Sequence, residues 1–502
     1  MPLPGRSCFG ATTDIANHDD LCHNLPQVIA PGHHCLSESH IATRQESGRQ
    51  TYPPVSWRSE LRTFMLLSLL VFLSSQALGS DENWTRFRGP NANGVAADDQ
   101  RLPDSWGQNA NIKWKAPIPG WGWGSPIVWG DRVFISAVHS DEDYEKPKGG
   151  LYLGRGRETP PDTVHHWMVY CLSLESGKVL WKREAHQGKP KVPRHPKSTY
   201  AAETPTTDGK RLYVLFGDVG LYCYDFDGTP LWNHPIEARK TMWGYGAAAS
   251  PVVHDGQVIM VYDNQESSYI SAIDAATGKT RWKVNREEKS TWATPLVWQH
   301  DGRTEIVTAG KNENRSYGTD GSLLWHFDGR MSVLTIPSPF TSDGLLYITS
   351  GYFQDNKRPV YALRPGAKGD IGLTDDRESN DSIVWSLQKM GPYNTSPIVY
   401  GGLYYTLLDR GMITCHDAQT GELVYNRKRF PKGASFTASP WAYNGKVFFL
   451  DESGNTFVMP VGREFKIERV NALDELCIAT PAVSQGKLLL RTVSQLYCIT
   501  QH

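Results

Sequence analysis

The stretch SPVVHDGQVIMVYDNQESSYISAIDAATGKTRW, residues 250–282, decides the fold of this chain. Its apolar runs are short and rich in β-branched or aromatic residues, and Gly, Asp or Asn interrupts them every few residues, which is typical of strands joined by turns. A proline at position 251 is compatible with a strand, because the first residue of a strand need not donate a ladder hydrogen bond. The stretch therefore predicts four antiparallel strands, at 250–253, 258–261, 269–273 and 280–282.

This pattern recurs eight times. Each copy opens with a Ser/Thr-Pro pair, and its prolines are Pro126, Pro205, Pro251, Pro295, Pro339, Pro397, Pro440 and Pro481. Five of the seven spacings lie between 41 and 46 residues, and the other two, of 79 and 58 residues, carry insertions. A period near 44 fits one four-stranded propeller blade and is too long for leucine-rich or ankyrin units.

The two ends of the repeat array complement each other. The eighth copy stops after its third apolar run at 495–499, whereas Asn111-Ile112-Lys113-Trp114-Lys115 has the form of a fourth strand without a blade of its own. Because a closed ring leaves no exposed sheet edge, we predict that this segment completes the last blade. The predicted fold is an all-β, eight-bladed β-propeller with four-stranded antiparallel blades; seven blades with a separate hairpin are the alternative.

The segment 272–282, with Ala272, Asp274, Thr277, Gly278 and Trp282, resembles the tryptophan-docking motif of pyrroloquinoline-quinone-like (PQQ-like) β-propeller repeats. Weaker copies lie at 171–181, 223–232, 317–325 and 415–425, and 86–90 (RFRGP) resembles the lead-in of exported bacterial members. The resemblance extends from about residue 84 to the C-terminus. It implies a fold more than a function, since the family includes quinoprotein dehydrogenases, the propeller lipoprotein of the outer-membrane β-barrel assembly machinery and many members without an assigned role.

Tryptophans at the motif position are expected to be structural. A turn glycine adopts a backbone conformation that other residues resist, and the Trp covers the outer edge of the neighbouring blade with a large apolar area. The expected docking residues are Trp114, Trp181, Trp232, Trp282 and Trp325.

Composition and the N-terminal region indicate an exported protein that does not bind nucleic acid. The 502 residues have a formal net charge of −1 and no basic stripe. An apolar run at 64–73 follows two arginines and precedes Ala77-Leu78-Gly79, which predicts a signal peptide at 64–79 and a periplasmic or secreted protein without a transmembrane span after cleavage. The predicted domains are a non-conforming leader (1–63, disordered or not translated), the signal peptide (64–79), a lead-in segment (80–110) and the propeller (111–502).

The leader leaves two interpretations open. A signal peptide seldom begins so late in a chain, so translation is expected to start near Val55 or Met65. The alternative is a metal-binding leader built from the cysteines and histidines at positions 8, 22, 33, 34 and 35.

The cysteines of the propeller are expected to be unpaired core thiols. Four of them share one repeat position, which Ala272 and Ala362 occupy in other copies, and a position shared by Cys and Ala is small and buried. Equivalent positions in different blades lie too far apart for a disulfide. The four are Cys171, Cys223, Cys415 and Cys498, and Cys477 is not placed by this argument.

A candidate ligand site comes from the segments that precede each Ser/Thr-Pro pair, because in propellers these lie near the central channel. The segments are rich in aromatic residues, which form either a funnel for a flat ligand or peptide or the packing between blades. The candidates are Trp121, Trp123, Tyr200, Trp243, Tyr245, Trp292, Tyr393 and Phe436.

The two insertions, 139–167 and 364–382, are the parts least explained by a ring. The first, with the nearby stretch 189–197, is basic, so it is either a docking site for an acidic partner or a solvated flap. His165, His166 and His195 lie in these polar segments and are expected to be solvated rather than ligating.

These observations favour an exported, non-catalytic scaffold of the cell envelope that binds a protein or a small ligand as a monomer, without a cofactor or metal. The alternative is a PQQ-dependent alcohol or sugar dehydrogenase. As the resemblance implies, quinoprotein alcohol dehydrogenases use adjacent cysteines, a Ca²⁺ ion and an Asp base, and this chain has no adjacent cysteines. Acids that remain open for a cation site are Glu203, Asp263, Asp409, Asp474 and Glu475.

Overall fold

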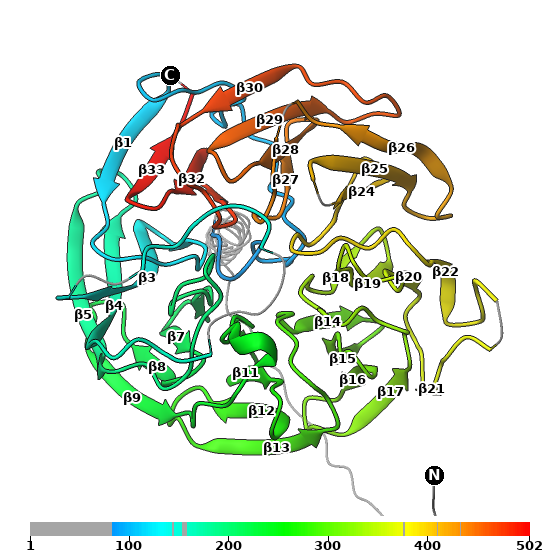
Figure 1. Cartoon of the computed structure of the whole chain (residues 1–502), viewed down its shortest axis with the longest axis horizontal. Coiled ribbons are helices and arrows are strands. Elements are labelled where there is room, and N and C mark those ends of the chain that lie inside the picture. The colour runs from blue at the N-terminus through cyan, green and yellow to red at the C-terminus, as the bar shows by residue number, and fades with distance from the viewer. Residues whose placement is uncertain are drawn as a thin grey trace, which may run out of the picture. The chain divides into compact units, whose positions relative to one another are not determined.

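Eight β-sheets surround one axis in the computed structural model (Figure 1). It describes residues 83–142, 145–152, 158–374, 377–408, 410–431 and 433–501. Within these ranges the one helical element is the 3-10 turn η1 (Met242–Gly244), and no helix is long and apolar enough to cross a membrane. The predicted all-β, eight-bladed propeller is thus confirmed, whereas the predicted leader and signal peptide lie outside the described residues.

In blades one to seven the strands follow the sequence order from the axis outward, and in blade eight the outermost strand is the N-terminal β1 (Ile112–Pro117). Blades one to three are β2 (Ile127–Trp129), β3 (Arg132–Ser140), β4 (His165–Ser173) and β5 (Val179–Gly188); β6 (Thr206–Thr207), β7 (Leu212–Phe216), β8 (Gly220–Tyr224) and β9 (Pro230–Pro235); and β10 (Val252–His254), β11 (Gln257–Tyr262), β12 (Ser268–Asp274) and β13 (Thr280–Arg286). Blades four and five are β14 (Leu296–His300), β15 (Arg303–Thr308), β16 (Asn314–Tyr317) and β17 (Leu323–Phe327); and β18 (Phe340–Ser342), β19 (Leu345–Thr349), β20 (Val360–Leu363) and β22 (Ile383–Leu387). Blades six to eight are β23 (Ile398–Tyr400), β24 (Leu403–Leu408), β25 (Met412–Asp417) and β26 (Leu423–Arg429); β27 (Trp441–Tyr443), β28 (Lys446–Leu450), β29 (Asn455–Pro460) and β30 (Arg469–Ala472); and β31 (Ala482–Ser484), β32 (Lys487–Arg491), β33 (Gln495–Ile499) and β1.

The last blade is closed by the N-terminal strand β1 (Ile112–Pro117). It pairs antiparallel with β33, so that Trp114 lies opposite Cys498 and Lys115 opposite Tyr497 (Figure 1). This pairing confirms the predicted closure and removes the alternative of seven blades with a separate hairpin.

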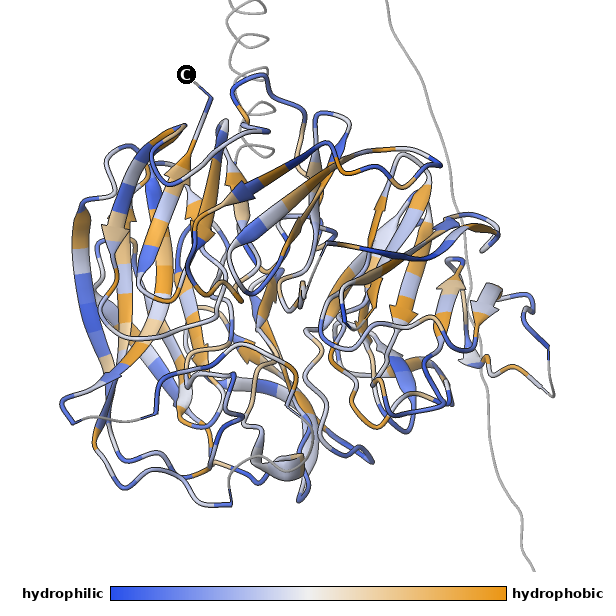
Figure 2. Cartoon of the chain, turned by 45° about the horizontal axis from the view of Figure 1, so that its top comes forward, coloured by the Kyte–Doolittle hydropathy of each residue, from blue (hydrophilic) through white to orange (hydrophobic). Residues whose placement is uncertain are grey.

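Burial separates the inner strands from the outer ones. The second strand of a blade is almost wholly buried, as β11 is, whereas the fourth strand alternates between exposed and half-buried residues, as β13 does. Figure 2 shows hydrophobic residues concentrated along the strands and hydrophilic residues on the connecting loops. Each core therefore lies between neighbouring blades, which is the arrangement that alternating strand faces dictate.

The small repeat position lies opposite the tryptophan position. Cys171 pairs with Trp181, Cys223 with Trp232, and Ala272 with Trp282 across the third and fourth strands. A small residue leaves room for the indole, which explains why Cys and Ala alternate there. All five described cysteines are free and buried, as expected for the four at the shared repeat position, and Cys477, which the repeat did not place, is buried as well. Burial raises the pKa of Cys171 to about 12.

Four of the five expected docking tryptophans reach the next blade. Their indole N–H groups donate to backbone carbonyls at 2.8–3.2 Å: Trp114 to Leu174, Trp181 to Phe226, Trp232 to Ala275, and Trp282 to Thr319. Each ring also lies against a turn glycine with positive φ, so that a Cβ on Gly278 would stand 2.7 Å from Trp232.

Trp325 differs from the other four. It is fully buried, and its indole donates to the carboxylate of Glu305 in its own blade at 2.7 Å. The cause is the second insertion, whose strand β21 (Gly369–Asp370) pairs in parallel with β17 and covers this edge (Figure 1). Part of the 364–382 insertion therefore extends blade four.

The lead-in segment crosses from one side of the ring to the other. Trp84 pairs with Val128 in blade one, and the carbonyl of Thr85 accepts the N–H of Thr207 in blade two. The buried guanidinium of Arg88 donates to the carbonyl of Pro397 in blade six and lies 4.9 Å from the ring centroid of Phe340 in blade five. Beyond it, residues 94–106 bond to blade seven, and Arg101 accepts a hydrogen bond from Gln501. The segment 84–88 thus ties opposite blades together, and Arg88 is the member of the RFRGP sequence that reaches blades five and six.

The first insertion is shorter than predicted. β3 ends at Ser140 and β4 begins at His165, so the insertion between them spans 141–164. The prediction that His165 and His166 are solvated loop residues is wrong, because both lie on β4 and are buried.

Candidate functional site

A chain of hydrogen bonds made by the Ser/Thr-Pro pairs surrounds the axis. In each case the backbone N–H of one Ser or Thr donates to the side-chain hydroxyl of the Ser or Thr in the next blade, at 2.9–3.1 Å. The chain runs through Ser125, Thr204, Ser250, Thr294, Ser338, Ser396, Ser439 and Thr480. The repeated hydroxyl thus has a structural reason that the sequence pattern alone did not supply.

Arg491 bridges the seam between blade eight and blade one. Its buried guanidinium donates to the carbonyls of Ser136 at 2.8 Å and Gly124 at 3.2 Å. Gly122 makes room for it, since a Cβ there would lie 2.7 Å from the guanidinium. Desolvation lowers the pKa of Arg491 to about 9.

Inside this ring lies a cavity of about 210 Å³. Its lining follows a period of two: it includes seven of the eight ring hydroxyl residues and every residue two positions before them. The latter are Trp123, Ala202, Ala248, Trp292, Ile336, Asn394, Thr437 and Ile478. Because alternate residues of an extended segment point to the same side, this spacing was the signal in the sequence that could have identified the lining.

Only four of the eight aromatic candidates line this channel cavity: Trp123, Tyr245, Trp292 and Tyr393. The other four are not part of its lining. Trp121 pairs with Val138, Tyr200 and Phe436 belong to cores between blades, and Trp243 packs against Tyr245 at 5.5 Å. Three of the four lining aromatics, Tyr245, Trp292 and Tyr393, also pack against one another in a buried cluster. Ligand binding by the lining aromatics stays a prediction.

Other lining residues come from parts that sequence reasoning did not connect to the channel. Phe87 comes from the lead-in segment, and Leu151 and Tyr152 come from the first insertion. The insertion is held against the ring because the N–H of Gly150 donates to the Glu452 carboxylate at 2.5 Å. The insertion therefore forms part of the cavity wall.

The cavity has one lining lysine, Lys197, and its charge is neutralised. Its Nζ lies 2.6 Å from the Glu452 carboxylate, and the two residues are only 8% and 5% exposed. Glu452 also accepts hydrogen bonds from Thr437 at 2.6 Å and Ser435 at 3.2 Å. The Lys197–Glu452 pair itself therefore carries no net charge.

His195 lies at the cavity as a neutral ring, so its expected solvation is wrong. Burial, followed by repulsion from Lys197 and Arg194, lowers its pKa to about 4. Its Nδ1 accepts the backbone N–H of Lys197 at 3.1 Å, which puts the ring proton on Nε2. The ring makes an edge contact with Tyr245 at 4.5 Å between centroids.

The acids considered for a cation site are not brought together. Asp263 pairs with Arg286, Asp474 accepts from Gln108, and Glu475 accepts from Ser494. Asp409 lies outside the described residues.

Glu203 lies instead at a separate cavity of about 70 Å³, together with Asp218. Burial raises the pKa of Glu203 to about 8 and that of Asp218 to about 6. Glu203 accepts the N–H of Gly217 at 3.0 Å, and Asp218 accepts the hydroxyl of Tyr262 at 2.9 Å.

Comparison with known proteins gives relatives of two kinds. A curated relative, "Polyvinylalcohol dehydrogenase" from Pseudomonas sp, is 20% identical over 277 residues, which is 48% of this chain and only 36% of that protein's length. Among solved structures, BamB from Moraxella catarrhalis has a TM-score of 0.52 at 11% identity, covering 78% of this chain and 97% of that one. A europium-containing methanol dehydrogenase has a TM-score of 0.55 at 11% identity, covering 84% and 98%.

The family comparison is decisive for membership. The model described as "Outer membrane protein assembly factor BamB" matches residues 166–293 and 266–499, which together make up more than half of the chain. The docking-type repeats and the eight-bladed ring agree with that match. The chain therefore belongs to the PQQ-like β-propeller family that this model, described as an outer membrane protein assembly factor, represents.

Proposed function

We propose that this protein is an exported, non-catalytic binding module of the cell envelope, and that its channel cavity receives an uncharged ring from a small ligand or from a partner protein's side chain. The observation that carries the proposal is the composition of the cavity wall. Aromatic and hydroxyl side chains dominate it, its lysine is neutralised by Glu452, and no Asp or Glu belongs to the described lining. Apolar walls with a few converging polar groups are typical of small-molecule sites. The family's description supports an envelope location.

A quinoprotein dehydrogenase is the second candidate, because a relative carries the name of a polyvinylalcohol dehydrogenase. The residues of the cavity do not fit Ca²⁺ and PQQ. Calcium takes six to eight oxygen ligands that usually include carboxylates, and the described lining offers none. The volume of about 210 Å³ also lies below the roughly 300–1,000 Å³ of pockets that enclose drug-sized ligands.

The test is a titration of the full chain with two neutral ring compounds, methyl β-glucoside and p-cresol, the latter being the side-chain analogue of tyrosine. At least one is expected to change the intrinsic tryptophan fluorescence and raise the melting temperature, since Trp123 and Trp292 line the cavity. Ala248→Leu fills the cavity and is expected to abolish the response. Ala276→Leu, at an exposed turn of the same blade, is the matched control and is expected to preserve it.

Catalysis is tested separately with PQQ and Ca²⁺, following dye-linked oxidation of an alcohol or a sugar. Turnover that Ala248→Leu abolishes would refute the non-catalytic assignment. A fluorescence response that persists unchanged in Ala248→Leu would show instead that the channel cavity is not the binding site.

A further inference from the structure

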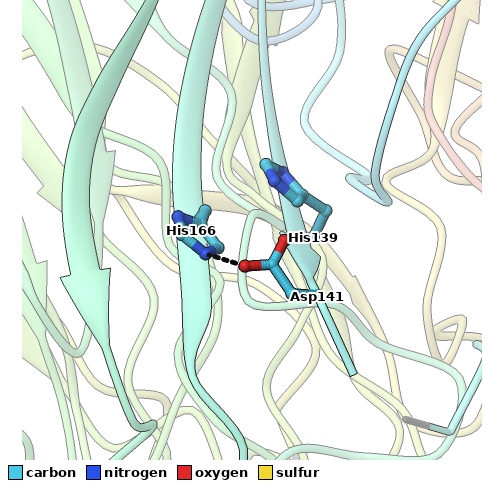
Figure 3. Close-up of side chains that lie close together, drawn as sticks. All are labelled: His139, Asp141 and His166. Atoms are coloured by element: carbon cyan, nitrogen blue, oxygen red, sulfur yellow. Dashed lines mark ion pairs between the residues drawn. The ribbon is translucent and has the colours of Figure 1, made fainter. Parts of the chain in front are cut away.

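Two histidines face each other where β3 and β4 extend beyond the other blades' strands. His139 and His166 are direct partners across these strands, and their rings stack with centroids 4.8 Å apart and an interplanar angle of 11°. Asp141 follows β3 directly, and its carboxylate points toward His166 (Figure 3). One ligand-type atom from each of the three side chains lies within 4.8 Å of the others.

Nδ1 of His139 is buried without a hydrogen-bond partner, and the contact of Nε2 of His166 is an ion pair with Asp141. His166 is only 9% exposed, and its Nε2 lies 3.3 Å from the Asp141 carboxylate. Buried polar atoms are nearly always satisfied, so the unpartnered nitrogen of His139, next to a second imidazole and a carboxylate, points to a ligand that is shared by the three side chains.

Glu184 on β5 orients the central histidine. Its carboxylate lies 2.8 Å from Nδ1 of His166, so in the neutral ring that nitrogen carries the proton and Nε2 keeps its lone pair. A carboxylate behind a ligating histidine is the usual outer partner of a zinc-bound imidazole. β3 and β4 thus supply two candidate imidazole ligands, the loop after β3 supplies the Asp141 carboxylate, and β5 supplies Glu184, which orients His166.

We propose that His139, Asp141 and His166 bind a divalent transition-metal ion of the Zn²⁺ class, with Glu184 as the positioning residue. Imidazole and carboxylate together suit Zn²⁺, and three protein ligands leave a fourth position for water. Ligands at about 2.0–2.1 Å around a tetrahedral ion lie roughly 3.3 Å apart, so the cluster must contract. Contraction requires the two stacked imidazoles to tilt toward a common point and the Asp141 side chain, which is 81% exposed, to rotate toward them.

The bound ion would hold together the base of the 141–164 insertion, which is part of the channel-cavity wall. The competing account is a metal-free ion pair, in which a protonated His166 lies between Asp141 and Glu184. The two accounts differ in what His139 does, because only the metal site requires its nitrogen.

The test uses the untagged full chain, stripped with chelator and titrated with Zn²⁺ by calorimetry and with Co²⁺ by visible absorption. The wild type is expected to bind one more Zn²⁺ than His139→Asn, and only the wild type is expected to show the absorption of a low-symmetry Co²⁺ site. Glu184→Gln should weaken binding by about 10–100-fold. His326→Asn, which alters a histidine beside Glu313 in blade four, is the control and should bind as the wild type does.

Asp141→Asn keeps the test valid if the histidine variants misfold, because this exposed residue does not belong to a core. It is expected to lower affinity at least tenfold. Equal stoichiometry and equal affinity for wild type, His139→Asn and Asp141→Asn would overturn the metal site and leave the ion pair as the explanation.

Discussion

Removing the charge of Lys197 tests how the segment after β5 is joined to blade seven. In the wild type, Lys197 of the segment after β5 and Glu452 of blade seven form a buried pair 2.6 Å apart. Lys197→Met preserves most of the apolar stem but leaves the Glu452 carboxylate buried with only hydroxyl and backbone donors. The folded state of this variant must therefore hold an uncompensated charge.

The expected loss follows from the burial of both partners. Breaking a buried ion pair by removing one partner costs about 3–5 kcal/mol. For a cooperative unit of roughly 400 residues, an unfolding entropy of about 2.1 cal/mol/K per residue converts this loss into a melting temperature lower by about 4–6 °C. The double variant Lys197→Met, Glu452→Gln removes both charges, so it is expected to recover part of that loss.

The assay is thermal unfolding followed by calorimetry, with ligand-free protein at one pH. Lys113→Met is the control, because its pair with Glu175 is largely exposed and screened by solvent, so no measurable change is expected. The reasoning is refuted if Lys197→Met melts like the wild type, or if the double variant shows the full sum of the two single losses.

Three further predictions concern stability and reactivity. Gly278→Ala and Gly256→Ala share the strain of a positive φ, of about 1–2 kcal/mol, but only the first places a Cβ 2.7 Å from Trp232; chemical denaturation should show Gly278→Ala to be the less stable, and equal losses would contradict the docking role. Because burial raises the folded-state pKa of Glu203 to about 8, above its ordinary value, the folded state binds the proton more tightly; stability should fall by about 1.4 kcal/mol per pH unit between the two values, and denaturant melts of Glu203→Gln should lack that slope. The five described cysteines should resist iodoacetamide in the native state, because burial raises their pKa values; peptide mapping that finds any of them rapidly alkylated would contradict this.

The ring could be predicted because its evidence is local and repeated. The missing fourth strand of the last copy and the unassigned strand around Trp114 both follow from comparing copies, and the pairing with β33 matches them. The position shared by Cys and Ala could be recognised as small and buried for the same reason. Its cause, a tryptophan directly opposite, needs the register of the third and fourth strands.

The channel cavity was only half predictable. Counting two residues back from each Ser/Thr of the ring would have selected Trp123 and Trp292 and rejected Phe436. The same rule would have missed Tyr245 and Tyr393, which line the cavity from odd-numbered offsets. Tyr152 and Phe87 are different, because nothing in their local sequence relates them to the channel. They reach it through contacts between distant segments, such as the bond from Gly150 to Glu452, 302 residues apart in sequence.

Contacts between separate segments also explain why His165 and His166 were wrongly predicted to be solvated. A polar stretch that contains adjacent histidines is usually a solvated loop, and the pattern of 139–167 gave no sign that two strands lengthen into it. The register shows otherwise, since His139 and His166 are partners on β3 and β4. What a strand partner does to a histidine, by burying it or by setting a second ring against it, cannot be read from either segment alone.

Closure of the ring and formation of the cavity depend on one segment. Phe87 lines the cavity, Arg88 binds the carbonyl of Pro397 on the far side of the axis, and the chain then continues along blades seven and eight into β1. At the seam that β1 closes, Arg491 bridges blades eight and one. Residues 94–106, which connect Phe87 to β1, are bonded to blade seven and to Gln501. We therefore predict that release of β1 from β33 would loosen this segment and, through it, the cavity wall contributed by Phe87. Binding in the channel should therefore stabilise closure of the ring, because a ligand that prefers the closed state shifts the equilibrium toward it.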